Sequence, residues 1–330
     1  MKVLLTGASG MLGRATARAL ADRGDDVTVL QRRPSGLGLP EVLADVADAD
    51  AVLRAVEGSE AVVHLAAKVN VTGEWADYAR ANIVGTQAVV DACRRAGVQR
   101  LVAVSSPSVA HSGASLVGVG AAPADPLAAR GPYARSKARA EQIALAADGA
   151  ALAVLAVRPH LVWGPGDTQL VARIVKRARQ GRLPLMGAGA VLVDTTYVSN
   201  AVDALVAALD RCHPDGVHGE ALVVSNGEPR PIAEILGAMA EAGGAPRPTR
   251  HLPVGLAAAV GAVAEALWSL RPGDDRDPPL TRFLVEQLST AHWFDQRHTR
   301  QALGWSPAVS LDEGFGRLAR WYTEGEPAPV

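Results

Sequence analysis

A glycine-spaced turn close to the first residue constrains the fold of this chain more than any other feature. The apolar run Val3–Leu5 leads into the string TGASGMLG at Thr6–Gly13, and a helical pattern then continues to Arg23, where Gly24 ends it. A strand, a glycine turn and a helix in this order form a phosphate-binding unit, because the free N–H groups at the start of a helix attract anions. The order predicts that the chain binds a dinucleotide.

The three glycines of this turn suit three separate tasks. Gly7 allows the tight turn, Gly10 lets the backbone approach a pyrophosphate, and Gly13 lets the helix pack closely on the strand. The alternative is a loop followed by a packing glycine in an alanine-rich chain. We predict cofactor contacts along the whole turn, from Gly7, Ala8, Ser9, Gly10, Met11, Leu12 and Gly13.

Short apolar strands alternate with helices along the next part of the chain. They are expected at Val27–Gln31, Val42–Ala44, Ala61–Leu65, Leu101–Val104 and Leu152–Val157. This alternation predicts an α/β fold, a doubly wound parallel Rossmann sheet with helices on both faces, whose ligands bind at the carboxyl ends of the strands. The residues expected there, in one crevice with the glycine turn, are Asp45, Val46, Leu65, Ala66, Ala67, Ser105 and Ser106.

The end of the second strand bears on which dinucleotide binds. Gln31-Arg32-Arg33 stands where an acidic residue would hydrogen-bond a ribose 2′-hydroxyl. Two guanidinium groups suit a 2′-phosphate, so Arg32 and Arg33 favour NADP(H); NAD(H) is the alternative if the pair is only a solvated basic turn. Asp45 is either an acceptor for the adenine amino group or a helix cap.

A tyrosine and a lysine four residues apart are the candidates for the chemistry. Tyr133 and Lys137 share one face of a helix whose first turn holds Pro132. A cation beside a phenol lowers its pKa from about 10 toward neutrality, as proton transfer at working pH requires. The same spacing also arises by chance on ordinary surface helices, so the pair gains its meaning from the rest of the chain.

The alternation becomes irregular in the second half, which predicts two parts. We assign residues 1–160 and 194–225 to the dinucleotide-binding domain, and residues 161–193 and 226–330 to a smaller, helix-rich substrate lobe. In that lobe the apolar run Leu252–Leu270, interrupted by Glu265, is too short to span a membrane. It is either a buried helix, a cover over an apolar substrate, or a peripheral contact with a membrane surface.

The composition of the chain indicates which kinds of partner it can bind. The chain has 33 basic and 34 acidic residues and a formal net charge of −1 without a basic tract, which argues against nucleic acid and favours a small-molecule partner. Cys93 and Cys212 lie in apolar helical patterns, and no metal-ligand spacing is present, so we expect buried thiols and no metal. The opening residues lack a signal-peptide pattern, so a cytoplasmic location is expected; a homodimer stays open.

Seven strings in a fixed order give the chain a resemblance to the extended short-chain dehydrogenases/reductases over nearly its whole length. They are TGASGMLG at Thr6–Gly13, the Asp45 turn, HLAA at His64–Ala67, ANIVGT at Ala81–Thr86, VSS at Val104–Ser106, YARSK at Tyr133–Lys137 and RPHLVWGPGD at Arg158–Asp167. The resemblance implies that Tyr133 donates or accepts the proton, that Lys137 assists it and anchors the ribose, and that Ser106 steadies the substrate oxygen. It also implies that Asn82 organises the neighbouring helix, and that Pro159 and Val162 contact the nicotinamide.

Further strings narrow the resemblance. Ala66–Trp75, Ser105–Val109 and Pro278–Asp295 are similar to the 3β-hydroxysteroid dehydrogenase-like group, and within it to the bacterial reductases of 2-alkyl-3-ketoalkanoic acids in olefin biosynthesis. This implies NADP-dependent reduction of a ketone on an apolar, lipid-like substrate to a secondary alcohol. The alternatives are an NAD-dependent 3β-hydroxysteroid dehydrogenase, a sugar-nucleotide epimerase or dehydratase, and a dinucleotide-sensing module without catalysis.

The predicted substrate pocket has one departure from the relatives. Ala110–Ala122 is expected to be a loop of small residues, and it offers no clear anchor for a substrate carboxylate. His111, His160 and Trp163 are candidates for the pocket, although each is equally compatible with a packed loop residue.

Overall fold

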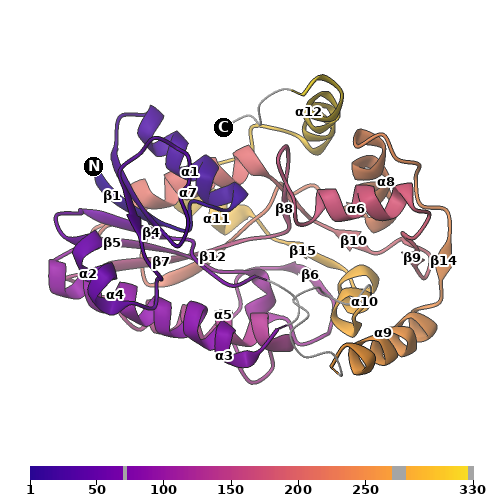
Figure 1. The fold of residues 1–330 in the computed structure, drawn as a ribbon, viewed down its shortest axis with the longest axis horizontal. Coiled ribbons are helices and arrows are strands. Elements are labelled where there is room, and N and C mark those ends of the chain that lie inside the picture. Colours follow the sequence, from indigo (N-terminus) through magenta and orange to yellow (C-terminus); the bar gives the residue numbers. More distant parts are fainter. Residues whose placement is uncertain (70–72, 270–279, 326–330) are drawn as a thin grey trace.

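The computed structural model describes residues 1–69, 73–269 and 280–325 (Figure 1). Leu270, the last residue of the predicted apolar run, and Pro278, the first residue of one matched string, lie outside the described residues. Residues 70–72, within the string Ala66–Trp75, lie outside them as well.

Seven parallel strands form the large sheet, with β1 near its middle. Leu5 of β1 pairs with Val29 on one side and with Val63 on the other, and these apolar side chains are buried. The chain runs from β1 outward through β2 and β3, then returns and builds the other side, so the strand order reverses beside β1 and opens a crevice there. The predicted doubly wound parallel sheet is confirmed. In spatial order the strands are β12 (Glu220–Val224), β7 (Ala153–Pro159), β5 (Arg100–Val104), β4 (Ala61–His64), β1 (Lys2–Thr6), β2 (Asp26–Gln31) and β3 (Glu41–Leu43).

Helices cover both faces of this sheet (Figure 1). One face carries α1 (Met11–Asp22), α7 (Val198–Arg211) and α11 (Arg297–Leu303), and the other carries α2 (Ala49–Val56), α4 (Gly85–Ala96) and α5 (Gly131–Leu145). The short helix α3 (Trp75–Tyr78) and the π-helix η1 (Ala79–Val84) lead into α4. Cys93 and Cys212 are buried free thiols in these layers, as predicted.

Local sequence explains where several of these helices begin and end. Pro132 occupies the first turn of α5, where no hydrogen bond to its nitrogen is needed, and Gly131 before it has a positive φ of 80°. The side chain of Asp48 accepts a hydrogen bond from the Ala51 N–H and caps α2, while Gly97 ends α4 in the left-handed conformation. The start of α5, whose first turn carries Tyr133, is therefore favoured by its own residues.

A second hydrophobic cluster lies beside the first and defines what we call the helical half, the part built around α6, α8 and α12. Trp163 and Tyr197 are fully buried at its centre. The elements added here are η2 (Pro107–Ala110), β6 (Leu116–Val119), β8 (Val162–Trp163), α6 (Val171–Arg179), β9 (Leu185–Met186), β10 (Leu192–Val193), β11 (Thr196–Tyr197), β13 (Arg230–Pro231), α8 (Ile232–Ala242), β14 (His251–Leu252), α9 (Val254–Ser269), α10 (Arg282–Ser289), β15 (His292–Phe294) and α12 (Leu311–Glu324).

A small four-stranded sheet, in the order β13-β10-β15-β6, connects the two parts of the molecule. Its edge strand β6 lies within residues 1–160, which we assigned to the dinucleotide-binding domain, so that part of the chain contributes to both sheets. The expectation of a continuous loop over Ala110–Ala122 is wrong, because Leu116–Val119 forms β6. The strand has only four residues and is flanked by small ones, and it is held in place because it pairs with β15 far along the chain.

Helix α9 accounts for most of the described portion of the predicted apolar run, whose first residue, Leu252, belongs to β14. Its side chains Val254, Leu256, Val260 and Val263 are exposed, while Ala257 packs beneath them. Among the helices in the described ranges, none combines the length and apolar character that crossing a membrane requires.

Candidate active site

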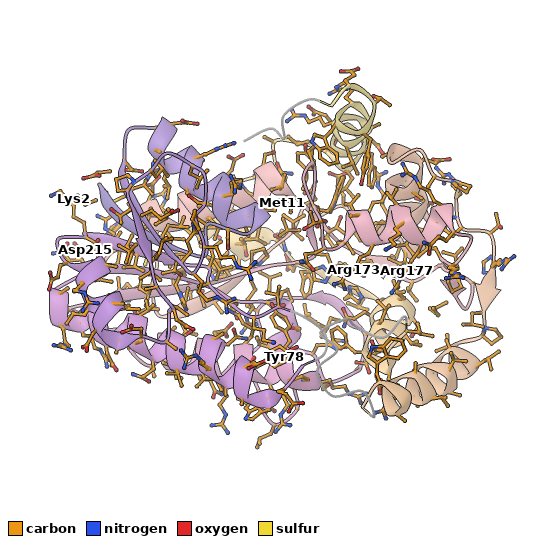
Figure 2. The ribbon with its side chains drawn as sticks, in the orientation of Figure 1. Lys2, Met11, Tyr78, Arg173, Arg177 and Asp215 are labelled. Carbon is orange, nitrogen blue, oxygen red and sulfur yellow. The ribbon has the colours of Figure 1, made fainter. Side chains whose placement is uncertain are left out.

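A cavity of about 1250 Å³ runs from the glycine turn across the carboxyl ends of the strands and into the helical half. Met11 lies in the first turn of α1, and this end of the helix faces the helical half (Figure 2). The strand order reverses at this place, where open α/β sheets bind their ligands. The cavity therefore lies where the sequence predicts the crevice.

The glycine turn fits a pyrophosphate. A Cβ on Gly7, whose φ is 86°, would lie 2.7 Å from the Ala66 nitrogen, and a Cβ on Gly13 would lie 2.3 Å from the Gly7 oxygen. Both positions therefore require glycine for packing. A Cβ on Gly10 would meet only the Gly7 oxygen, at 3.8 Å, so Gly10 faces open space at the N-terminus of α1, and a bulky anion has room to approach its backbone.

A buried chain of hydrogen bonds fixes the backbone opposite this turn. The Thr6 hydroxyl lies 2.7 Å from His64 Nδ1, and His64 Nε2 lies 2.9 Å from the Thr86 hydroxyl. Ala66 donates its N–H to Thr6 Oγ1, which sets the backbone beside the cavity. Burial and the nearby Lys137 charge lower the pKa of His64 to about 3, so this ring is neutral and holds the site in place without taking part in proton transfer.

The far end of the cavity, beside β2, is rich in arginine. Arg32 lines it, whereas Arg33 is exposed and is not among the described residues that form its wall. Arg14 and Arg18, one turn apart on α1, line it too, and Arg14 donates to the Ser35 carbonyl at 2.5 Å. This end could hold an adenosine ribose and a phosphate attached to it.

Asp45 is the aspartate in the wall beside these arginines. Its carboxylate accepts from the Ala47 N–H at 2.9 Å and from Arg80 at 3.2 Å. Burial acts to raise the pKa of Asp45, but the Ala47 N–H, Arg80 and Arg32 together hold it below its usual value. The helix that follows is capped by Asp48, so capping α2 is not the task of Asp45.

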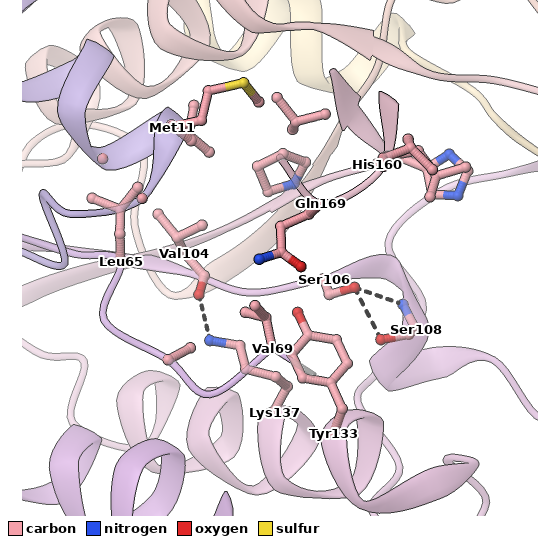
Figure 3. A pocket seen from close by; sticks show the side chains of 18 of the residues that line it. Met11, Leu65, Val69, Val104, Ser106, Ser108, Tyr133, Lys137, His160 and Gln169 are labelled. Carbon is pink, nitrogen blue, oxygen red and sulfur yellow. Dashed lines mark hydrogen bonds between the residues drawn. The ribbon is translucent and has the colours of Figure 1, made fainter. Parts of the chain in front are cut away.

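Tyr133 and Lys137 rise side by side from α5 into the cavity, with Ser106 opposite the phenol (Figure 3). The Ser106 hydroxyl faces the Tyr133 phenol and lies 2.9 Å from the Ser108 hydroxyl. Burial raises the pKa of Tyr133, and the nearby Ser106 hydroxyl only partly opposes this rise. The expectation that Lys137 lowers this pKa is therefore wrong for this geometry, in which the phenol keeps its proton.

Lys137 turns its charge toward the sheet. Its ammonium donates to the Val104 carbonyl at 2.6 Å, at the end of β5 (Figure 3). The side chain is 5% exposed, and burial lowers its pKa to about 8, against the opposing charge of Glu141 one turn further along α5. A lysine of this kind changes its charge close to working pH, which is common at catalytic sites.

Asn82 is not part of the described cavity wall. Its side chain instead hydrogen-bonds to neighbouring segments of the chain. Its amide accepts from the Lys68 N–H at 2.7 Å and donates to the Ser136 hydroxyl at 2.8 Å. Ser136 in turn donates to the Tyr133 carbonyl at 2.8 Å. Asn82, in the π-helix, is therefore linked to the first turn of α5 through Ser136.

Most residues predicted for the site meet in this one cavity. Ala8 is fully buried behind the turn, and Trp163 packs against Phe315 at 4.5 Å between ring centres, so both lie away from the described cavity wall. The predicted residues that do line it are Gly7, Ser9, Gly10, Met11, Leu12, Gly13, Arg32, Asp45, Val46, Leu65, Ala66, Ala67, Ser105, Ser106, His111, Tyr133, Lys137, Pro159, His160 and Val162.

The sequence did not reveal the apolar wall on the helical side, nor four arginines of the cavity wall, which are Arg14, Arg18, Arg80 and Arg130. Arg14 and Arg18 had a usable signal, since a spacing of four places them on one face of the first helix. Arg130 had none, because its place in the wall depends on contacts with α10. The apolar side chains from α6, α8 and α10 are Ile174, Ile232, Ile235, Leu236, Met239, Phe283, Leu284 and Leu288.

These groups can carry out acid–base chemistry on an oxygen held between Tyr133 and Ser106. Tyr133 holds a proton at its phenolic oxygen, Ser106 supplies a second hydrogen bond to the same oxygen, and Lys137 places a positive charge beside them. A nicotinamide bound in the cavity supplies or accepts the hydride.

The comparisons with known proteins agree with this geometry. Residues 3–225 match the model of the NAD dependent epimerase/dehydratase family. The 2-alkyl-3-oxoalkanoate reductase of Stenotrophomonas maltophilia (strain K279a) is 44% identical over 326 residues, which cover 96% of this chain and 98% of the relative. The protein of the same name from Shewanella oneidensis is 37% identical over 329 residues, covering 95% and 84%.

A solved structure described as MoeE5 in complex with UDP-glucose and NAD has a TM-score of 0.75 and 26% identity, and the match covers 98% of this chain and 99% of that one. The family match spans the large sheet and its glycine turn, and the relatives match the chain from end to end. The chain therefore belongs to the NAD dependent epimerase/dehydratase family, in the extended branch of the short-chain dehydrogenases/reductases, and it is a pyridine-nucleotide-dependent oxidoreductase.

Proposed function

We propose that the protein uses NADPH to reduce the ketone of a 2-alkyl-3-oxoalkanoate-type lipid to a secondary alcohol. The observation that carries this proposal is the pair of reductases of that name, 44% and 37% identical over nearly the whole chain. The side chains that line the cavity also support this proposal. Its wall in the helical half includes a group of leucine, isoleucine, methionine and phenylalanine side chains, which suits alkyl chains.

In the direction of reduction, Tyr133 gives its proton to the ketone oxygen while Ser106 donates a hydrogen bond to it. The raised pKa of Tyr133 keeps that proton available near neutral pH. Lys137 stabilises the phenolate that remains. In the direction of oxidation the same phenolate removes the proton of an alcohol.

The arginine-rich end of the cavity supports NADP(H) over NAD(H). Arg14, Arg18 and Arg32 surround the region in which the residues after β2 would meet the ribose, and Gln31 there is occupied by Glu41, to which it donates at 2.7 Å. Several guanidinium groups favour an added phosphate through charge-assisted hydrogen bonds.

The function is tested with stable compounds in the oxidative direction, because 3-oxo acids lose CO₂ readily. A 2-alkyl-3-hydroxy fatty acid, a 3β-hydroxysteroid and a UDP-sugar are each incubated with the protein and NADP⁺ or NAD⁺, and reduced cofactor is followed by absorbance. We expect turnover of the fatty acid with NADP⁺. Turnover of the UDP-sugar or of the steroid instead would overturn the lipid assignment.

We also propose a cytoplasmic protein that touches lipid surfaces through α9. The exposed side chains Val254, Leu256, Val260 and Val263 support a peripheral contact. Sedimentation with phospholipid vesicles tests it, and Leu256→Glu together with Val263→Glu should abolish sedimentation. A homodimer through the same face is the competing arrangement, and a mass measurement in solution without lipid detects it.

A further inference from the structure

A second polar group of side chains lies at the wall of the cavity, beyond the proton-transfer residues. We call Arg130, His111 and Glu286 the Arg130 cluster. Arg130 is the residue before α5, three positions ahead of Tyr133, and His111 directly follows η2, five positions after Ser106. Glu286 reaches them from α10. Two members therefore sit on the same short segments as the residues that handle the substrate oxygen.

The guanidinium of Arg130 is held in one place. It donates to Glu286 Oε2 at 2.7 Å and to the Ser112 carbonyl at 3.0 Å. It also packs on Gly113, where an added Cβ would lie 2.6 Å from the guanidinium carbon. Arg130 nevertheless stays 57% exposed and lines the cavity, so the cation is rigid and still accessible to a ligand.

Two histidines of the cavity wall each have one buried ring nitrogen without a hydrogen-bond partner among the described residues. His111 and His292, 4% and 2% exposed, both line the cavity. His111 Nδ1 lies 3.4 Å from Glu286 Oε1, but His111 Nε2 and His292 Nδ1 make no hydrogen bond with the described residues. The surrounding side chains shield both atoms from solvent, so the polar group that the cluster offers to a ligand is the accessible guanidinium of Arg130.

We propose that the Arg130 cluster binds the carboxylate of the substrate. This rests on the proposed function, in which the carboxylate is attached to the carbon next to the ketone and must lie close to Tyr133 and Ser106. Arginine matches a carboxylate in geometry as well as charge. The cluster thereby supplies the anchor that the residues of Ala110–Ala122 did not reveal, with His111 from that segment and Arg130 from outside it.

Glu286 is expected to weaken the binding of a carboxylate at Arg130. Its carboxylate already occupies one edge of Arg130 and repels a second anion, so the substrate competes with it for the guanidinium. Removing the charge of Glu286 should therefore strengthen the binding of an acid, whereas removing the charge of Arg130 should weaken it. A purely structural clasp between α5 and α10 would lose function with either change.

The experiment compares two probes that differ only in the carboxyl group, a 2-alkyl-3-hydroxy fatty acid and the secondary alcohol with the same carbon chain lacking that group. With NADP⁺, Arg130→Gln should raise the KM of the acid about 10- to 100-fold, the loss of a charge-assisted hydrogen bond, and leave the KM of the alcohol unchanged. Glu286→Gln should lower the KM of the acid. Arg135→Gln, on α5 five positions after Arg130 but outside the described cavity wall, is the matched control and should change neither KM.

Equal effects of Arg130→Gln on acid and alcohol, or no effect on either, would overturn the proposal while the function stands. If the unaltered protein oxidises neither probe, the proposed function is wrong and the carboxylate site falls with it.

Discussion

The guanidinium of Arg158 grips the carboxylate of Glu141 through two hydrogen bonds of 2.8 and 2.5 Å, and the two side chains are only 2% and 1% exposed. Arg158 also donates to the Ala122 carbonyl at 2.7 Å. Glu141 follows Lys137 by one turn of α5, and Arg158 immediately precedes Pro159 in the cavity wall. The pair therefore ties the proton-transfer helix to the end of β7 that we assign to the nicotinamide.

Breaking this pair should cost stability. Arg158→Met leaves the Glu141 carboxylate buried and uncompensated, and we expect the free energy of unfolding to fall by about 3–5 kcal/mol. The double variant Glu141→Leu with Arg158→Met removes both charges and should recover most of that loss. Urea unfolding of the three proteins measures it. A double variant less stable than the single one would show that the ion pair is not the cause.

Replacing the phenol should remove chemistry without removing binding. In Tyr133→Phe the ring remains and the proton is lost, so kcat should fall by about 100- to 10,000-fold while the Kd of NADPH, measured by calorimetry, stays the same. Tyr322→Phe is the matched control, because this tyrosine packs against Trp321 away from the described cavity wall. Full turnover in Tyr133→Phe would show that Tyr133 is not the proton donor.

The glycines of the turn should separate folding from binding. Gly10→Ala places its methyl group in open space, so we expect a stable protein whose Kd for NADPH rises about tenfold or more as a phosphate contact is lost. Gly13→Ala would push against the Gly7 oxygen and should lower the free energy of unfolding by about 1–3 kcal/mol. Thermal unfolding and calorimetry together test this division; unchanged cofactor affinity in Gly10→Ala would argue against pyrophosphate at this turn.

Cofactor preference should depend on one of two adjacent arginines. Arg32 lines the cavity and Arg33 lies outside its described wall, although nothing in the sequence distinguishes the two. Arg32→Gln should raise the KM of NADPH about 10- to 100-fold and leave that of NADH unchanged. Arg33→Gln is the neighbouring control and should change neither. Equal losses with both cofactors would mean that Arg32 does not meet a 2′-phosphate.

The parts of the site that the sequence predicted are those encoded by contiguous residues. The strand, the glycine turn and the helix follow one another within about twenty residues. The spacing of Tyr133 and Lys137 alone predicts that they share one face of a helix. The parallel sheet followed from alternation in the same way. In each of these cases the local pattern and the final structure agree.

The features that the sequence missed depend on segments that meet only in the folded chain. β6 exists because it pairs with β15, and Arg130 enters the site through Glu286 on α10, more than a hundred residues later. The pKa of Tyr133 is a second example. Its spacing from Lys137 suggested a lowered value, but burial and the turn of Lys137 toward Val104 decide it.

Lys137 should give opposite pH dependences for activity and stability. Burial, opposed by the charge of Glu141, lowers its pKa from 10.5 to about 8, whereas the pKa of Tyr133 is raised, so Lys137 is the first of the two to lose its proton as pH increases. Reduction needs the cation, and kcat/KM should therefore fall up to tenfold per pH unit above about 8. Between about pH 8 and pH 10.5 the unfolded chain holds a proton on this lysine that the folded chain has released. The contribution of Lys137 to the free energy of unfolding therefore increases as pH rises.

The pH dependences of the unaltered protein and of Lys137→Met are compared by urea unfolding, which measures stability, and by NADPH oxidation, which measures activity. The difference between the two proteins gives the contribution of Lys137 to each. Lys176→Met, at an exposed position of α6, should reproduce the unaltered profile. If the alkaline fall in activity survives in Lys137→Met, another group controls it.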